Sequence, residues 1–565
     1  MNYDQAVKEV LKTDSLFQFE ETEIRGIKFK AFKNTPKTLP DLLKYGKDRR
    51  EWGDFIIFEN ERIAYDDFLL QVKLLGSYLQ NDLGVKKGDR IAVAMRNYPE
   101  YTVLFMAIVS IGAVIVFVNG WWTTEEMEYG FDDSGAHICF ADRERIKVIK
   151  PFADKKKVRL ISVRAEEIKD ILSYEAILKD AKNRDIKVNI YTDDDCAVMY
   201  TSGSTGHPKG VVLTHRGAIS ATFSWLMAER VGGLLAGQEK LETRRPSSIL
   251  NASPLFHVNG THPNFLYSIA RGSKIILMYK WDPKEAVDII ERESVTRITA
   301  VPTVVADLVA EASSQNKSLE TLEFLGAGGA KRPPPQVGVE KKALPSTDIA
   351  SGYGMTETNA LGIGIAGDEY LDNPELAGRL YPPIQEIKIV DEKGKELNYG
   401  ELGEIALKSP ANMRCYLNKP DATRDVLRDG WMHTGDLATL NSNGFVVIRD
   451  RKKNIIIRGG ENISCLEVEG AIQKHPDIVE SIVFPVPSNR FGEEVGVCIH
   501  AKDDHSLSNV SIIEFLKDKL AKFKIPVHFW WINKSLPRGA TDKLDRILTK
   551  KLCLDNQWEK FNGSQ

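Results

Sequence analysis

The sequence predicts an α/β protein in which a large N-terminal part holds two doubly wound parallel sheets. Helical and β-branched segments alternate through the first half of the chain, as they do where helices join parallel strands. The alternation resumes after residue 210 and indicates a second sheet of the same class. The chain has 565 residues, which is too long for one hydrophobic core, so at least two domains are expected.

The elements of the two sheets follow from local periodicity. Residues 103–118 form one long apolar run, but Gly112 breaks it, so we expect a buried helix and then a central strand rather than a membrane span. The expected helices here are residues 65–83, 97–109 and 124–133, and the expected strands are 90–95, 113–118 and 138–141. Beyond residue 210 the expected strands are 247–251, 274–278, 297–301 and 322–326.

The pattern changes after residue 378. Residues 387–390 and 403–408 are typical of short antiparallel strands, which predicts a small β-barrel. A compact α+β unit is expected beyond it, with strands at 455–457, 482–486 and 495–501 and helices at 466–474 and 511–520. Because residues 450–453 are polar, we expect an N-terminal domain of residues 1–450 and a C-terminal domain of residues 451–565.

The composition is that of an ordinary globular chain, with 42% hydrophobic and 27% charged residues. The net charge of −3 gives no electrostatic argument for nucleic acid or an anionic membrane as a partner. The six cysteines are far apart and include no Cys-x-x-Cys pair, so we expect reduced thiols and no zinc site. Residues 1–21 lack a signal-peptide pattern and the last residues form no peroxisomal address, so a cytoplasmic location is expected.

The most informative segment is Tyr200-Thr-Ser-Gly-Ser-Thr-Gly-His-Pro-Lys-Gly210. Its glycines let successive backbone N–H groups point inward, while its hydroxyls and its lysine add donors, and this combination suits a polyphosphate. The lysine precedes the last glycine, so the spacing is not that of the Gly-x4-Gly-Lys-Ser/Thr loop. The alternative is a solvated surface turn. The expected ligand residues are Thr201, Ser202, Gly203, Ser204, Thr205, Gly206 and Lys209.

Three further motifs follow along the chain. They are Gly352-Tyr-Gly-Met-Thr-Glu357, then Trp431-Met-His-Thr-Gly-Asp436 with Asp450-Arg451 downstream, and Pro537-Arg-Gly-Ala-Thr-Asp-Lys543. With the segment at 200–210, their order resembles that of the adenylate-forming superfamily, which contains acyl-CoA synthetases, peptide-synthetase adenylation domains and luciferases. The resemblance extends from residue 39 to residue 552.

The resemblance implies a site for ATP and Mg²⁺. The nucleotide would be bound by Gly352, Tyr353, Gly354 and Met355, with the Tyr353 ring on adenine, and by Asp436 and Arg451 at the ribose. Thr356 and Glu357 would act at the α-phosphate, with Glu357 and Thr201 as metal ligands. From the residues alone, a packed tyrosine, a turn aspartate and a surface ion pair are the alternatives.

The resemblance also singles out Lys543 as the catalytic lysine of adenylation. A positive charge between a carboxylate and the α-phosphate offsets the repulsion of two anions and stabilises the charge that develops on phosphorus. Two residues of this last motif depart from the family pattern, because Asp542 replaces the usual glycine and Gly539 the usual threonine.

The remaining expected site residues concern the acyl group and CoA. By resemblance, Gly459 and Gly460 line the path of the pantetheine arm, and Lys453 is the hinge of a mobile C-terminal domain. His257 resembles the gate of the acyl pocket, and Gly328 and Gly329 its wall. A tight turn at 459–460 and a packed core histidine at 257 are the alternatives.

These expectations combine into one function. The chain should be an ATP-dependent acyl-CoA synthetase that uses ATP, Mg²⁺ and coenzyme A and acts on a medium- or long-chain fatty acid, with a homodimer as an open hypothesis. Short-chain, sulfur-containing and aromatic acids stay open as substrates. The other hypotheses are an enzyme that loads a carrier protein, a non-catalytic nucleotide-binding protein, and a luciferase-type oxygenase.

Overall fold

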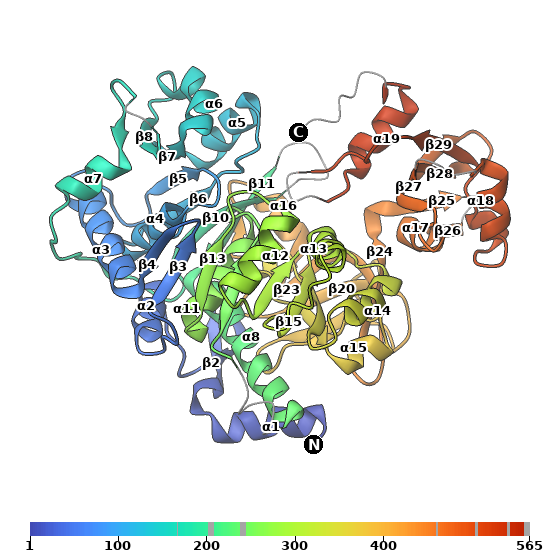
Figure 1. The fold of residues 1–565 in the computed structure, drawn as a ribbon, viewed down its shortest axis with the longest axis horizontal. Coiled ribbons are helices and arrows are strands. Elements are labelled where there is room, and N and C mark those ends of the chain that lie inside the picture. The colour runs from blue at the N-terminus through green and yellow to red at the C-terminus, as the bar shows by residue number, and fades with distance from the viewer. Residues whose placement is uncertain are drawn as a thin grey trace.

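The computed structural model describes residues 1–165, 168–201, 208–237, 245–458, 461–502, 507–539 and 543–558. Figure 1 shows two sheet-and-helix units side by side, the first in blue and teal and the second in green and yellow. A separate unit formed by the last part of the chain, in orange and red, lies at one end.

The first sheet is mixed and has the strand order β21-β11-β10-β6-β5-β7-β8-β9. Neighbouring strands from β10 to β9 are parallel, whereas β11 is antiparallel to both β10 and β21. Its strands are β5 (Arg90–Ala94), β6 (Val114–Phe117), β7 (Ile138–Asp142), β8 (Arg159–Val163), β9 (Leu172–Ser173), β10 (Asp195–Thr201), β11 (Lys209–Thr214) and β21 (Cys415–Tyr416). Its helices are α3 (Tyr65–Asn81), α4 (Pro99–Ser110), α5 (Thr124–Ser134), α6 (Arg143–Ala153) and α7 (Tyr174–Asp180).

The apolar run at 103–118 folds as the sequence predicts. Helix α4 is buried over nearly its whole length, and the chain then turns at Gly112, where φ is +73°, before β6 begins. Glycine suits this left-handed conformation because it has no Cβ. Within the described ranges, no helix is long and apolar enough to cross a membrane.

The second sheet has the order β18-β17-β16-β15-β14-β12-β13-β3-β4, and its strands from β16 to β3 are parallel. Its strands are β3 (Asp54–Phe58), β4 (Glu61–Ala64), β12 (Ser248–Asn251), β13 (Lys274–Leu277), β14 (Arg297–Ala300), β15 (Phe324–Gly328), β16 (Asp348–Tyr353), β17 (Ile363–Ala366) and β18 (Arg379–Leu380). The helical segments around it are α2 (Leu39–Lys47), α8 (His215–Ala236), α10 (Val258–Gly260), η2 (Thr261–Leu266), α11 (Tyr267–Arg271), α12 (Pro283–Arg292), α13 (Pro302–Ser314), α14 (Pro334–Ala343), η3 (Thr356–Thr358) and α15 (Asp368–Asp372).

The two faces of this sheet meet different helices. On one face, Ile298 and Ala300 of β14 pack in an apolar cluster with residues of α12, α13 and α14. Side chains alternate along a strand, so Arg297 and Thr299 lie on the opposite face. That face meets α11, because the Arg297 guanidinium lies over the ring of Tyr267. The helices α8 and α11 contact each other beside it.

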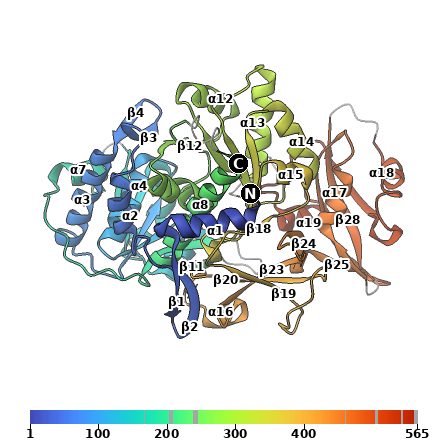
Figure 2. The same ribbon diagram turned by 90° about the horizontal axis from the view of Figure 1, so that it is seen from below.

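A third, antiparallel sheet stands where the sequence predicts the small barrel, and its pairings follow the order β19-β20-β23-β22 with β24 on β23. Its elements are β19 (Glu386–Val390), β20 (Gly403–Lys408), α16 (Pro420–Val426), β22 (Leu427–Arg428), β23 (Trp431–Leu440) and β24 (Val446–Arg451). The N-terminal elements are α1 (Tyr3–Thr13), η1 (Ser15–Phe17), β1 (Phe19–Ile24) and β2 (Ile27–Phe32). Figure 2 shows α1 beside α8 on the lower side of the molecule.

The C-terminal unit is built on a sheet of order β26-β25-β28-β27, with β29 added parallel to β28. Its elements are η4 (Lys452–Asn454), β25 (Ile455–Arg458), β26 (Glu461–Ser464), α17 (Cys465–Ile472), β27 (Ile478–Ser488), β28 (Gly492–Ala501), α18 (Asn509–Leu516), η5 (Lys522–Lys524), β29 (His528–Ile532) and α19 (Arg546–Leu554). Asp450 ties β24 to this unit, because its buried carboxylate accepts from Ser464 Oγ at 2.6 Å and from the N–H of Leu466 at 3.0 Å.

The predicted fold class is confirmed, with two mainly parallel sheets, a small antiparallel sheet and a small α+β unit. The strand expected at 482–486 is longer, from Ile478 to Ser488, and the strand expected at 322–326 runs instead from Phe324 to Gly328. The reason is a turn at its start. Leu319 has φ +47°, and the N–H of Leu322 donates to the Leu319 carbonyl, so the strand begins later.

Candidate active site

The predicted phosphate loop joins β10 to β11. These strands form an antiparallel hairpin in which Thr201 lies opposite Lys209, so the two ends of the loop are adjacent. The central residues of the loop lie outside the described residues, and their contacts with ATP stay predictions; these are Ser202, Gly203, Ser204, Thr205 and Gly206.

Helix α5 holds both ends of this loop. The Tyr200 hydroxyl donates to Asp133 Oδ2 at 2.9 Å, and the Tyr129 hydroxyl donates to the carbonyl oxygen of Pro208 at 3.2 Å. Tyr129 and Asp133 are four residues apart, so they lie on the same face of α5. We did not identify this pair from the sequence, because a tyrosine and an aspartate in an amphipathic helix give no local signal of such a role.

Glu357 is a buried carboxylate on η3, next to Thr356. It accepts a hydrogen bond from the Tyr416 hydroxyl at 2.7 Å, and Lys209 Nζ lies 4.8 Å from the centre of the Tyr416 ring. Burial raises the pKa of Glu357, while Tyr416, Arg451 and Lys209 oppose the rise. Tyr416 thus connects the lysine of the phosphate loop to the carboxylate of the second motif, and the sequence did not reveal it.

The chemistry of Glu357 fits a magnesium ion. Mg²⁺ prefers oxygen ligands and is commonly held by one or two carboxylates together with substrate phosphates. A nearby cation would also stabilise the ionised form of a carboxylate whose pKa burial has raised. Across the ranges that the structure describes, no cluster of three or more His, Cys, Asp or Glu side chains could hold a metal ion.

Tyr353, Asp436 and Arg451 form one hydrogen-bonded group. The Tyr353 hydroxyl donates to Asp436 Oδ2 at 2.7 Å, and Arg451 Nε donates to Asp436 Oδ1 at 3.0 Å. The strands explain the second contact, because Asp436 of β23 lies directly opposite Arg451 of β24. Burial and the Asp436 charge raise the pKa of Tyr353, so the phenol stays protonated and donates. Residues from two motifs therefore meet as the sequence predicts.

Lys543 reaches this group from the C-terminal unit. A Cβ placed on Gly329 would lie 3.5 Å from both Nζ and Cε of Lys543, so the lysine side chain lies along that glycine. Lys543 is exposed to solvent, although many protein atoms lie around its side chain. Desolvation, and then the Arg451 charge, lower the pKa of Lys543 to about 8, whereas Asp436 opposes this.

The predicted acyl-side glycines lie close to the lysine. Gly328 of β15 and Gly352 of β16 are neighbours in register, and a Cβ on Gly328 would lie 3.1 Å from the Gly352 carbonyl oxygen. Gly354 allows another close approach, since a Cβ there would lie 2.1 Å from the Ala360 carbonyl oxygen. The neighbouring Met355 begins the turn that carries Thr356 and Glu357.

His257 is a neutral imidazole in this region. It lies just before α10, and its ring centre is 4.5 Å from that of Phe256. Burial, followed by the charge of Lys543, lowers the pKa of His257 to about 3. Its Nε2 is buried and has no hydrogen-bond partner in the described parts of the chain. This histidine cannot carry a positive charge near pH 7, which suits the wall of an acyl pocket.

The roles of three further residues stay predictions. Gly459 and Gly460 lie outside the described residues. Lys453 belongs to η4, directly after Arg451, and its position in the backbone is all that the structure describes. Its neighbour Lys452 lies 3.6 Å from Glu404 of β20.

Comparison with known proteins identifies the class. A family model described as AMP-binding enzyme matches residues 47–417, and a model of the C-terminal domain of AMP-binding enzymes matches residues 467–543. The first match covers more than half of the chain, so this chain belongs to the AMP-binding enzyme family. The resemblance to adenylate-forming enzymes is thereby confirmed.

Individual relatives cover nearly the whole chain. A long-chain-fatty-acid–CoA ligase of Bacillus subtilis (strain 168) is 29% identical over 545 residues, which are 90% of this chain and 93% of the relative. A feruloyl-CoA synthase of an Amycolatopsis species is 31% identical over 462 residues, 82% of this chain and 88% of the relative. The structure of the Bacillus subtilis o-succinylbenzoate CoA synthetase with its acyl-adenylate intermediate has a TM-score of 0.76 and 26% identity, covering 90% of this chain and 97% of that one.

These matches confirm three predictions about the chemistry. The chain is an enzyme, an AMP-forming acid–thiol ligase with acyl-CoA ligase activity. Such ligases use ATP, Mg²⁺ and CoA, as predicted for this chain. A further neighbour, an anthranilate CoA ligase with a TM-score of 0.82, is 21% identical and supports the fold alone.

Proposed function

We propose that this chain joins a medium- or long-chain aliphatic acid to CoA in two steps at one site. In the first step a carboxylate oxygen attacks the α-phosphorus of ATP, pyrophosphate leaves, and the acyl-adenylate stays bound. In the second step the CoA sulfur attacks the acyl carbonyl carbon, its proton is released, and AMP leaves. Each step needs positioning and charge stabilisation rather than a side-chain nucleophile.

The observation that carries the proposal is the position of Lys543. Its ammonium lies beside Gly329 and near the Asp436–Arg451 pair, where the phosphates of a nucleotide bound through Asp436 would come within its reach. A cation there offsets the repulsion between the attacking carboxylate and the α-phosphate. In this proposal Lys543 is the catalytic residue of the first step.

The other site residues take supporting roles in the proposal. Tyr353 offers a ring to adenine, Asp436 and Arg451 hold the ribose hydroxyls, and Thr356 and Glu357 face the α-phosphate. When Mg²⁺ is bound, it supplies charge neutralisation to the phosphates, with Glu357 and Thr201 as its protein ligands. The loop residues 201–206 and Lys209 bind the β- and γ-phosphates.

The second step calls for a movement of the C-terminal unit. In the proposal, residues 451–565 rotate against residues 1–450 about Lys453, which takes Lys543 away and brings Gly459 and Gly460 to the path of pantetheine. An ion pair between Lys452 Nζ and Glu404 Oε2, 3.6 Å apart, lies next to this proposed hinge. One site could then serve both reactions.

Relatives support two classes of acid. The long-chain-fatty-acid–CoA ligases among them favour an aliphatic acid, which we take as the first candidate. The feruloyl-CoA synthase and the o-succinylbenzoate CoA synthetase favour an aromatic acid as the second. A phosphopantetheinyl carrier protein stays the alternative acceptor, and a homodimer stays a proposal.

A substrate panel tests the proposal. Purified protein is given ATP, Mg²⁺ and acids from two to eighteen carbons, together with benzoates and cinnamates, with CoA present or absent. We expect AMP release that depends on both the acid and CoA, with a maximum among the medium or long aliphatic acids. Release that does not depend on an acid would contradict ligase function, and faster release with a carrier protein than with CoA would change the acceptor.

A further inference from the structure

Arg297 is a charged residue on the face of the second sheet that meets α11. It opens β14, and its guanidinium carbon lies 3.7 Å from the centre of the Phe324 ring and 5.0 Å from that of Tyr267. Phe324 is its direct neighbour on β15, whereas Tyr267 belongs to α11. The guanidinium is thus held between a strand residue and a helix residue by contacts with two aromatic rings.

The charge of Arg297 has no counter-ion in the described parts of the chain. Its side chain forms neither a hydrogen bond nor an ion pair there, and its Nε is buried without a partner. The residue as a whole keeps some accessible surface. A partly buried guanidinium with unused donors is costly unless a ligand or water satisfies it.

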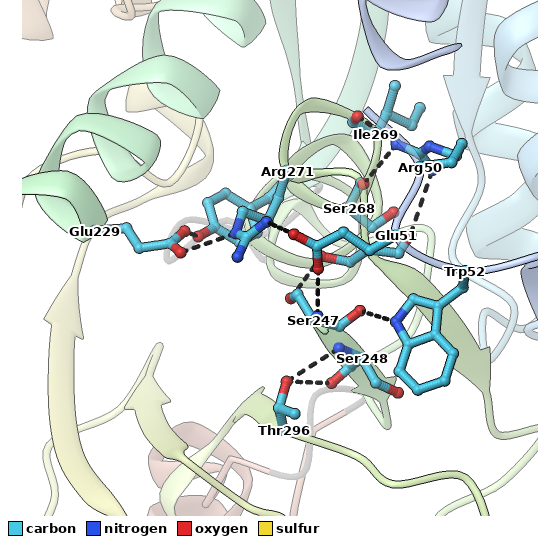
Figure 3. Close-up of polar contacts among 12 residues, drawn as sticks. Arg50, Glu51, Trp52, Glu229, Ser247, Ser248, Ser268, Ile269, Arg271 and Thr296 are labelled. Atoms are coloured by element: carbon cyan, nitrogen blue, oxygen red, sulfur yellow. Dashed lines mark hydrogen bonds and ion pairs between the residues drawn. The ribbon is translucent and has the colours of Figure 1, made fainter. Parts of the chain in front are cut away.

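The nearest acidic side chain around Tyr267 is already engaged. Glu229 of α8 accepts from the Tyr267 hydroxyl and from Arg271 Nε, the latter at 2.8 Å. Arg271 also pairs with Glu51, and Figure 3 shows Arg271 between the two carboxylates. The hydroxyl of Tyr267 and the guanidinium of Arg271 therefore both donate to Glu229. Among the described residues, Arg297 forms no ion pair with this carboxylate.

Arg297 lies on the same face of the second sheet as Gly328, which precedes the glycine beside Lys543. Phe324, Gly326 and Gly328 alternate along β15 onto this face, and a Cβ on Gly326 would lie 2.8 Å from Phe324 Cε1, so the Phe324 ring extends along the strand towards Gly328. Arg297 is opposite Phe324, four residues before Gly328, and a strand rises by about 3.3 Å per residue, so Arg297 lies about 13 Å from Gly328 along the strands.

We propose that Arg297 binds an anionic group at the far end of the acid substrate, so that the preferred acid carries a second carboxylate. This inference rests on the proposed function and narrows its substrate class. Aromatic rings flank the guanidinium and leave its in-plane N–H groups, which match a planar carboxylate in a two-bond contact. The span of about 13 Å favours diacids of intermediate length.

The test compares matched acids with the full-length enzyme. Dicarboxylic acids of four to sixteen carbons are paired with monocarboxylic acids of equal length and with their ω-methyl esters, and kcat/KM is measured from AMP release in the presence of CoA. We expect a diacid of intermediate length to exceed its monoacid and its ester at least about tenfold, as for a site built around a charged hydrogen bond. The statistical advantage of two reacting ends is far smaller.

Two variants assign the effect to Arg297. Arg297→Met keeps the length and removes the charge, and it should lower kcat/KM for the diacid at least about tenfold while the monoacid is unchanged or improved. Arg297→Lys keeps the charge and loses the planar guanidinium, so its kcat/KM for the diacid should lie between those of the wild type and Arg297→Met. A purely structural role would lower the values for both acids together.

The outcomes separate this inference from the proposed function. A wild-type enzyme that uses monoacids as well as diacids overturns the role of Arg297, and so does an equal loss for both acids in Arg297→Met. In either case acyl-CoA still forms and the proposed function stands. If no acid releases AMP with CoA, both fail. The comparison of diacids with monoacids uses the wild-type enzyme alone. It therefore still decides the question if Arg297→Met fails to fold.

Discussion

The lowered pKa of Lys543 predicts an alkaline limit to adenylation. Burial and the Arg451 charge bring this pKa to about 8 from the usual 10.5. A lysine with a pKa of about 8 is about 90% charged at pH 7 and about 10% charged at pH 9. Because the first step needs the ammonium, kcat/KM for ATP should fall about tenfold for each pH unit above 8.

Replacing Lys543 by arginine isolates the effect. The guanidinium stays charged throughout this range, so the Lys543→Arg enzyme should lose the alkaline fall even though its overall rate is lower. The assay is pyrophosphate release at limiting ATP between pH 6.5 and 10, since kcat/KM reports the free enzyme. At saturating ATP the bound phosphates favour the charged lysine, so the fall in kcat should move to higher pH.

Two results would refute this reasoning. A wild-type profile that stays flat to pH 10 would mean that Lys543 keeps an ordinary pKa in the working enzyme. An alkaline fall with the same midpoint in Lys543→Arg would assign the titration to another group, to ATP or to the metal. Lys543→Arg is measured under identical conditions, so it controls for the titration of ATP and for the effect of pH on the metal.

Four other substitutions test the site and the fold. Lys543→Ala should reduce adenylate formation at least about 100-fold yet spare thioester formation from supplied acyl-adenylate, and equal losses in the two half-reactions would contradict its role. Tyr200→Phe should raise KM for ATP about three- to tenfold with KM for the acid unchanged, because one end of the phosphate loop loses a hydrogen bond. Tyr416→Phe should raise the pKa of Glu357 further, so the Mg²⁺ concentration for half-maximal rate should increase at pH 6 more than at pH 8; an equal change at both would argue against it. Gly272→Ala should destabilise the protein by at least about 2 kcal/mol in denaturant unfolding, since φ is +86° and a Cβ would lie 1.8 Å from the Arg49 carbonyl oxygen.

Much of the site could be predicted because its residues stand in contiguous motifs. Asp436 and Arg451 are fifteen positions apart, yet hairpin pairing places them opposite each other, and the motifs alone were enough to associate them. Tyr416 could not be found in this way. It joins Lys209 to Glu357 through a phenol and a ring, and a tyrosine in a two-residue strand has no pattern that distinguishes it from a core residue.

The order of strands was the least accessible part of the fold. Periodicity identified the central strands β5, β6 and β7 of the first sheet and β12 to β15 of the second, because alternation and apolar runs are local properties. It did not reveal that β3 and β4 join the second sheet, far from their neighbours in sequence, since this pairing depends on how the units pack. Likewise, the start of β15 depends on a turn at Leu319 that apolar content does not encode.

The amino-acid sequence by itself determined the family and the reaction class and predicted the groups that bind a nucleotide, because each motif carries its chemistry in consecutive residues. Only the tertiary structure decided how strongly Lys543 is desolvated, which helix anchors the predicted phosphate loop, and that Arg297 lies between two rings with no counter-ion among the described residues. The physical reason is that burial and electrostatic interaction depend on everything that surrounds a group in space, and those surroundings come from segments hundreds of residues apart.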